Sequence, residues 1–192
     1  PFRSGRSFYS RDSVKPSVTV KLNTSSRSAF LNGYADGTFR PEANMTRAEA
    51  VVMLYRLSDV ENVSNTGDIF IDVPYNMWCA GEINAFANAG IIDVTSYFHP
   101  NQYITRAEFV EMLYRLMGSP SYSRGTLRFS DVTGATNEDA IYYAVSRGWV
   151  NGYADGTFRP FSYIARSEVA ALMTRLLNRT SGGSGVSYKD VP

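Results

Sequence analysis

The sequence predicts a mainly α-helical protein built from three repeated helix–loop–helix units, with a short extended segment near the N-terminus. The first observation is an internal copy: residues Asn32–Pro41 recur letter for letter at 151–160. The second is a helix-start motif, Thr46–Glu49, which returns as Thr105–Glu108 and, with two changes, as Ala165–Glu168. Both patterns keep a period of about 60 residues, and self-similarity at a fixed period is typical of a repeat architecture.

A third marker, an aromatic residue followed by x-Asp-Val, divides the chain between the units. It occurs at Phe70–Val73, Phe129–Val132 and Tyr188–Val191. The segments before each marker are rich in Ser, Gly, Asn and Thr, so we expect linkers there. We therefore expect an N-terminal tail over residues 1–16 and three repeats over 17–59, 70–117 and 129–177. Residues 178–192 are expected to be a linker that leads into a further copy of the marker.

The first and last segments bear on how the units are arranged. Ser17–Leu22 alternates between polar and apolar residues, which predicts a short strand or extended arm where later units have a helix. We expect residues 188–192 to fold back onto the front of the first unit and to complete a pseudo-threefold ring. Deleting them should then lower the melting temperature.

Two kinds of helix are expected in each complete unit. After each helix-start motif, apolar residues recur at helical spacing, as in 48–57 and 107–116. A weaker helical pattern precedes the repeated loop and stops at Gly90 and at Gly148. Glycine suits these positions because it adopts the left-handed conformation that often ends a helix.

The helix-start motif has two physical interpretations. Thr46 with Glu49, and Thr105 with Glu108, fit a capping box, in which the side chains satisfy free amides of the first turn; Glu168 keeps the carboxylate half of the box. Arginine is unexpected there, because a helix N-terminus already carries positive charge. Its recurrence as Arg47, Arg106 and Arg166 therefore predicts sites for a carboxylate or phosphate. The alternative is that each arginine pairs with a marker aspartate, Asp72, Asp131 or Asp190.

The repeated loop contains turn signals at Asn-Gly and Asp-Gly, which explain its glycines. Tyr34 and Tyr153 are expected either to fill the core or to stack on a sugar. Arg40 and Arg159 are expected either to add a second cation to the anion pocket or to be solvated. The loop lacks the alternating carboxylates of a calcium site, so no metal is expected.

The composition excludes several classes of function. A net charge of +1 over 192 residues gives no overall field for nucleic acid or a membrane surface. One cysteine, Cys79, and one histidine, His99, exclude an internal disulfide and a histidine-rich metal site. No apolar run is long enough to span a bilayer. The sequence has no nucleophile or phosphate-loop motif, and its carboxylates repeat with the fold, so we expect no catalytic residue and no cofactor.

Together the three motifs resemble the S-layer homology domain, over about residues 22–192. The resemblance implies a three-unit helical module that anchors bacterial surface proteins, without a covalent bond, to a pyruvylated secondary polysaccharide of the cell wall. It implies binding in the grooves between neighbouring units, by Arg47, Arg106 and Arg166 with Thr46 and Thr105 beside them. The expected protein is secreted, non-catalytic and located at the cell surface. The alternatives are a module that assembles surface-layer subunits and, less favoured, a wall-degrading glycoside hydrolase.

The three grooves are expected to differ. The first unit lacks its leading helix. The second has a shorter loop with His99 where the others have Arg40 and Arg159. The third has Ala165 in place of the capping threonine. We therefore expect only one or two grooves to bind ligand.

Overall fold

The structure, a computed structural model, describes residues 22–23, 29–60, 68–123, 125–126, 128–134, 137–179 and 187–191. The predicted tail 1–16 and most of the predicted extended segment therefore lie outside the described residues. The described end of that segment, Leu22, forms an isolated antiparallel bridge with Ser58.

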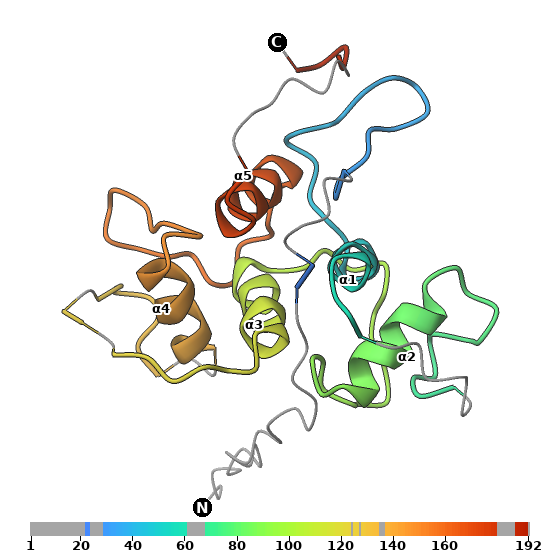
Figure 1. Cartoon of the computed structure of the whole chain (residues 1–192), viewed down its shortest axis with the longest axis horizontal. Coiled ribbons are helices and arrows are strands. Elements are labelled where there is room, and N and C mark those ends of the chain that lie inside the picture. Colours follow the sequence, from blue (N-terminus) through green and yellow to red (C-terminus); the bar gives the residue numbers. More distant parts are fainter. Residues whose placement is uncertain are drawn as a thin grey trace, which may run out of the picture.

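Five α-helices make up the regular structure of the described residues, and the mainly α prediction is confirmed (Figure 1). Their bounds are α1 Arg47–Arg56, α2 Ala80–Asn88, α3 Arg106–Leu116, α4 Glu138–Ser146 and α5 Arg166–Leu176. α1, α3 and α5 follow the three helix-start motifs, whereas α2 and α4 precede the loops of the second and third repeats. Gly90 and Gly148 lie just beyond α2 and α4 with φ of +70° and +69°, a conformation that glycine adopts without steric cost.

Capping residues define where α1 and α3 begin. The Thr46 hydroxyl accepts from the Glu49 amide at 3.2 Å, and the Glu49 carboxylate accepts from the Thr46 amide at 2.8 Å. Thr105 and Glu108 repeat both bonds at the start of α3. At α5 only the carboxylate half of the box exists: Ala165 has no hydroxyl, and the Glu168 carboxylate accepts from the Ala165 amide.

Completing this third cap should stabilise the protein. The backbone of Ala165, with φ −79° and ψ 154°, matches that of Thr46, with φ −79° and ψ 161°. We expect Ala165→Thr to raise the free energy of unfolding by about 1 kcal/mol, the usual value of such a cap. Calorimetry should show a melting temperature higher by about 2–4 °C. Thr105→Ala is the matched control and should lower it; a neutral Ala165→Thr would contradict the prediction.

The residues just before α1, α3 and α5 are joined in a closed cycle of backbone hydrogen bonds. The Met45 amide donates to Ile164, Ile164 to Ile104, and Ile104 back to Met45, at 2.9–3.1 Å. All three side chains are at most 1% exposed. This buried cycle brings the starts of the three helices together.

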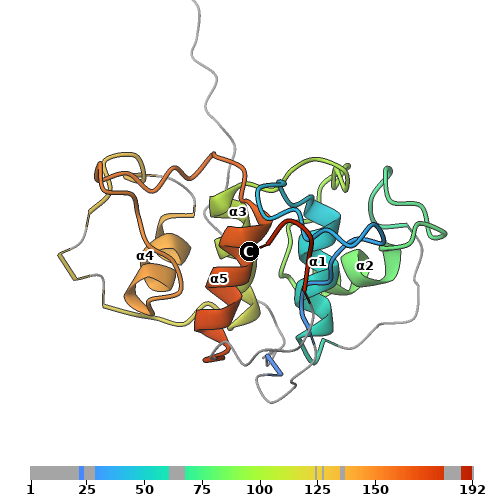
Figure 2. The same cartoon turned by 90° about the horizontal axis from the view of Figure 1, so that it is seen from above.

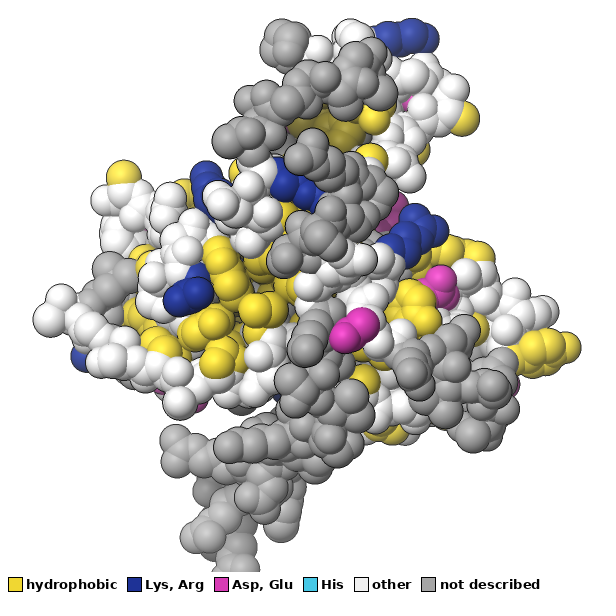
Figure 3. All heavy atoms as spheres, viewed as in Figure 1, with side chains coloured by type: hydrophobic (Ala, Val, Ile, Leu, Met, Phe, Trp, Pro, Cys, Tyr) yellow, Lys and Arg dark blue, Asp and Glu magenta, His cyan; other side chains and the backbone are white. Residues whose placement is uncertain are grey.

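The remaining helices pack outside this centre. α2 packs against α1 and α4 against α3, so that α2 and α4 lie at opposite ends of the molecule (Figure 2). Aromatic pairs join them, with ring centroids 6.0 Å apart for Tyr55 and Phe86 and 5.3 Å apart for Tyr114 and Tyr143. Hydrophobic side chains are visible between α3 and α4 on the face drawn in Figure 3. α5 has Thr174 at the corresponding position and no such helical partner among the described residues.

The marker aspartates hold the repeated loops. In the second and third repeats, Asp72 and Asp131 each accept two backbone amides of their own repeat's loop. In the first repeat the same contacts come from Asp190, 150 residues further along the chain. Residues 187–191 therefore lie against the loop of the first repeat.

Candidate ligand-binding groove

The three helix-start arginines each reach from one repeat to the loop of the next. In every case Nε donates to the backbone carbonyl of an aromatic residue in that loop: Arg47 to Phe98 at 2.9 Å, Arg106 to Phe158 at 3.1 Å and Arg166 to Phe39 at 2.9 Å. The guanidinium groups therefore lie where adjacent repeats meet, which is where the sequence resemblance implied a ligand. Their common backbone contact fixes each group in place.

The arginines differ in their acidic partners. Arg47 Nη1 lies 2.6 Å from Glu108, and Arg106 Nη1 contacts Glu168. The carboxylate at the matching position for Arg166 is Glu49, but no ion pair joins the two. Arg166 Nη2 instead donates to the Asn32 carbonyl at 2.7 Å. Within the described part of the chain, Arg166 is thus the one helix-start arginine with no carboxylate partner.

The alternative pairing with the marker aspartates is wrong. Both carboxylate oxygens of each marker aspartate accept hydrogen bonds from two consecutive loop amides, in Asp72, Asp131 and Asp190 alike. The carboxylates that face the arginines are the helix-capping glutamates of the next repeat. Glu108 and Glu168 therefore each have two roles: one carboxylate oxygen caps a helix and the other binds an arginine.

The loop tyrosines are covered by arginines. The Tyr34 ring has the Arg40 guanidinium at 3.9 Å and that of Arg166 at 4.9 Å from its centroid. Tyr153 has Arg159 at 3.8 Å and Arg106 at 5.0 Å. These cation–π contacts occupy ring surface that a stacked sugar would need. The geometry thus favours a packing role for both tyrosines.

The exposed loop arginines are also paired. Arg40 lies 2.7 Å from Asp36 and Arg159 lies 3.0 Å from Asp155. Hydrogen bonds from Thr38 and from the Arg40 guanidinium lower the pKa of Asp36 from 3.8 to about 2. Thr157 and Arg159 lower the pKa of Asp155 in the same way to about 2. These ion pairs brace the tips of the two loops.

This pKa shift gives a testable pH dependence. Because the pKa of Asp36 is lower in the folded than in the unfolded chain, its contribution to stability is present above pH 3.8 and is lost as the pH falls toward about 2. Carboxyl carbon NMR should give a midpoint near 2 for Asp36. Thr38→Ala should raise that midpoint, because the largest cause is removed; an unchanged midpoint would contradict the assignment.

A cavity of about 140 Å³ lies where the third and first repeats meet. Residues from several parts of the chain line it, among them Asn32, Glu49, Met53, Arg56, Trp78 and Arg166. Trp78 is 64% exposed, and Arg56, at the exposed end of α1, makes no polar side-chain contact with the described residues. Two arginines thus share this groove with one carboxylate, Glu49, one oxygen of which is bonded to Thr46.

Arg56 and Trp78 were not among the residues expected from the sequence to bind a ligand. The residue at the end of α3 that corresponds to Arg56 is Arg115, which is bound by Asp93 and Glu111, both at 2.7 Å. Its counterpart in α5, Arg175, donates to the Trp149 carbonyl at 3.2 Å. Comparing the three copies of the helix for acidic neighbours could have singled out Arg56.

A second hollow, of about 400 Å³, lies beside the loop of the third repeat and is bounded by Asp131 and residues 159–162. Its charged groups are already engaged, since Asp131 binds two amides and Arg159 binds Asp155. This hollow therefore offers no available charge to a ligand.

Reactive groups are few among the described residues. They contain no cluster of three or more His, Cys, Asp or Glu side chains that could hold a metal ion. Cys79 is buried beside α2, and burial raises the pKa of its thiol, which disfavours the reactive thiolate. In the same part of the chain, no helix has the length and apolar character that crossing a membrane requires.

Comparison with known proteins agrees with the repeat structure. The family model of the S-layer homology domain matches residues 22–51, 72–110 and 128–170, one match in each repeat. The chain belongs to the S-layer homology domain family. All three matches include the loop and the first part of the helix that follows it.

Curated relatives share this domain over a limited part of their length. "Cell surface glycoprotein 1" of Acetivibrio thermocellus is 36% identical over 79% of this chain, which spans 7% of that protein. The "Cellulosome-anchoring protein" of the same organism is 34% identical over 88% of the chain and 40% of its own length. An "S-layer protein" of Bacillus licheniformis is 30% identical over 72% of the chain and 16% of its own. The chain thus spans less than half of each relative.

Proposed function

We propose that this S-layer homology module is a non-catalytic anchor that binds a pyruvylated, acidic secondary cell wall polysaccharide at the bacterial surface. The names of the relatives, an anchoring protein and an S-layer protein, support a role at the cell surface. The observation that carries the proposal is the groove between the third and first repeats. Arg166 and Arg56 line it together, and neither has a carboxylate partner among the described residues.

Arg166 is suited to bind an acidic sugar substituent. Its side chain is 5% exposed and is oriented by two carbonyls, so little conformational entropy is lost when a ligand binds. These two bonds use two of the five N–H donors of a guanidinium. The remaining donors can bind a carboxylate with two parallel hydrogen bonds. The pyruvyl ketal carries such a carboxylate.

Trp78 and Arg56 complete the groove. The indole of Trp78 is large and mostly exposed, and it presents an apolar surface against which a sugar ring can pack. Arg56 adds a second positive charge to the lining of the groove. The ligand would thus meet one buried cation, one exposed cation and an aromatic surface.

The other two interfaces are less suited to an anion. Arg47 is paired with Glu108, and Arg106 is paired with Glu168. A carboxylate ligand would have to displace a glutamate that is already bound. We therefore propose one main binding groove, and we propose that Arg106 has a structural role.

Binding to purified cell wall tests the proposal. The module should sediment with native wall and should stay in solution with wall from which the pyruvyl groups have been removed. Equal sedimentation with both would favour the assembly module, whose arginines pair with carboxylates of a partner protein. Release of reducing sugar by the purified chain would contradict the non-catalytic assignment.

A further inference from the structure

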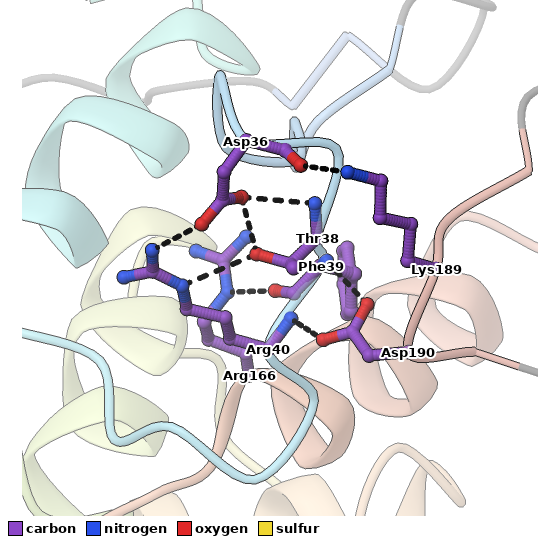
Figure 4. Close-up of polar contacts among 7 residues, drawn as sticks. All are labelled: Asp36, Thr38, Phe39, Arg40, Arg166, Lys189 and Asp190. Atoms are coloured by element: carbon purple, nitrogen blue, oxygen red, sulfur yellow. Dashed lines mark hydrogen bonds and ion pairs between the residues drawn. The ribbon is translucent and has the colours of Figure 1, made fainter.

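The C-terminal segment contacts the loop whose carbonyl holds Arg166. Figure 4 shows the arrangement of Asp190, Phe39, Arg40 and Arg166. Asp190 accepts from the amides of Phe39 and Arg40 with its two oxygens, both at 2.7 Å. The carbonyl of Phe39 accepts from Arg166 Nε at 2.9 Å. Asp190 thus lies one peptide unit away from the guanidinium of the proposed groove.

We infer that Asp190 is a positioning residue for the groove, and that the C-terminal segment thereby sets the affinity for the acidic glycan. This inference rests on the proposed function. The Arg40 amide and the Phe39 carbonyl belong to the same peptide unit, which is planar. Asp190 holds one side of that plane and Arg166 is bound to the other. Rotating the plane would therefore withdraw the carbonyl from Arg166.

The backbone at Arg40 needs this support. Its φ of +56° lies in the left-handed region, which is disfavoured for an arginine. Such residues persist where the surrounding contacts fix them, at a cost of about 1–3 kcal/mol. The amides of both Phe39 and Arg40 donate to Asp190, so these two bonds are among the contacts that hold the peptide in this conformation. Without them, the peptide would relax toward ordinary φ values.

The attachment of the segment is local and accessible. The Tyr188 ring lies 5.4 Å from Phe39, and its hydroxyl accepts from the Gly33 amide at 3.2 Å. Lys189 donates to the carbonyls of Asp36 and Gly37. Both Lys189 and Asp190 are exposed. The loop of the first repeat is thus held by a short surface contact with the far end of the chain, whereas Asp72 and Asp131 belong to the repeats that they hold.

The third repeat supplies a matched control. Asp131 binds the amides of Phe158 and Arg159, both at 2.8 Å, and the Phe158 carbonyl binds Arg106. Arg159 also has a positive φ, of +59°. The geometry is the same, but Arg106 is neutralised by Glu168 and lies in another interface. Asp131→Ala should perturb the fold in the same way without affecting the proposed groove.

The experiment uses Trp78 as the reporter. The chain has two tryptophans, so in the Trp149→Phe variant all tryptophan fluorescence comes from Trp78 in the groove. Titration with a pyruvylated monosaccharide should change its emission, and the sugar without pyruvate should bind more weakly. In this background Asp190→Ala should raise the dissociation constant about tenfold, whereas Asp131→Ala should change it less than about twofold. Asp190→Asn keeps one acceptor oxygen and should show a smaller loss.

A second readout does not depend on the ligand. In NMR spectra, Asp190→Ala should shift the Nε–H signal of Arg166, and Asp131→Ala should shift that of Arg106. An unmoved Arg166 signal, or equal affinity losses in the two variants, would overturn the positioning role while leaving the proposed function intact. A starting protein that does not prefer the pyruvylated sugar would overturn both.

Discussion

Replacing Arg166 by alanine is expected to weaken binding to the pyruvylated glycan at least tenfold. The side chain is 5% exposed and lines the groove between the third and first repeats, without a carboxylate partner among the described residues. A hydrogen bond to a charged group contributes about 1.5–3 kcal/mol. Since 1.4 kcal/mol corresponds to a factor of ten in the dissociation constant, one lost contact accounts for the effect. Calorimetric titration with glycan fragments measures it.

Arg47→Ala is the control for this experiment. Arg47 begins α1 as Arg166 begins α5, and its Nε also donates to a loop carbonyl. Because Glu108 already binds it, we expect its removal to change glycan affinity less than about twofold. Arg166→Lys should give an intermediate loss, because lysine keeps the charge but not the planar pair of donors. If Arg47→Ala and Arg166→Ala weakened binding equally, the single-groove proposal would be wrong.

The helices could be predicted from the sequence because their signals are local. Apolar spacing placed α1 and α3, and Gly90 and Gly148 marked the ends of α2 and α4. The repeated motifs also predicted that corresponding residues in the three copies would be related by the fold. They could not show which carboxylate faces each arginine, because that depends on how one repeat packs against the next.

The groove itself required the structure for the same reason. Arg56, Trp78 and Arg166 belong to the first, second and third repeats and meet only when all three repeats pack together. Nothing near Trp78 in the sequence predicts an arginine beside it. The difference between Arg166 and Arg106 could not be predicted from the sequence either, because both occupy the second position of the helix-start motif. They differ in whether a glutamate of the next repeat binds them.

Replacing Arg106 by alanine is expected to cause the largest loss of stability. Its guanidinium is 4% exposed and binds three partners, namely the carbonyls of Phe158 and Asn151 and the carboxylate of Glu168. Removing one member of a buried ion pair costs about 3–5 kcal/mol, because the other charge is left without its partner. The Glu168 side chain is 34% exposed, so water can solvate it in part and we expect the lower end of that range.

A loss of about 3 kcal/mol corresponds to a melting temperature lower by about 6–12 °C for a chain of this size. Arg159→Ala is the matched control, because Arg159 also lies over the Tyr153 ring but its pair with Asp155 is exposed. Exposed ion pairs contribute little, so its melting temperature should be nearly unchanged. Adding Glu168→Gln to Arg106→Met should recover part of the loss, since no unpaired charge is then buried. Equal melting temperatures for Arg106→Ala and Arg159→Ala would show that the buried pair does not hold the second and third repeats together.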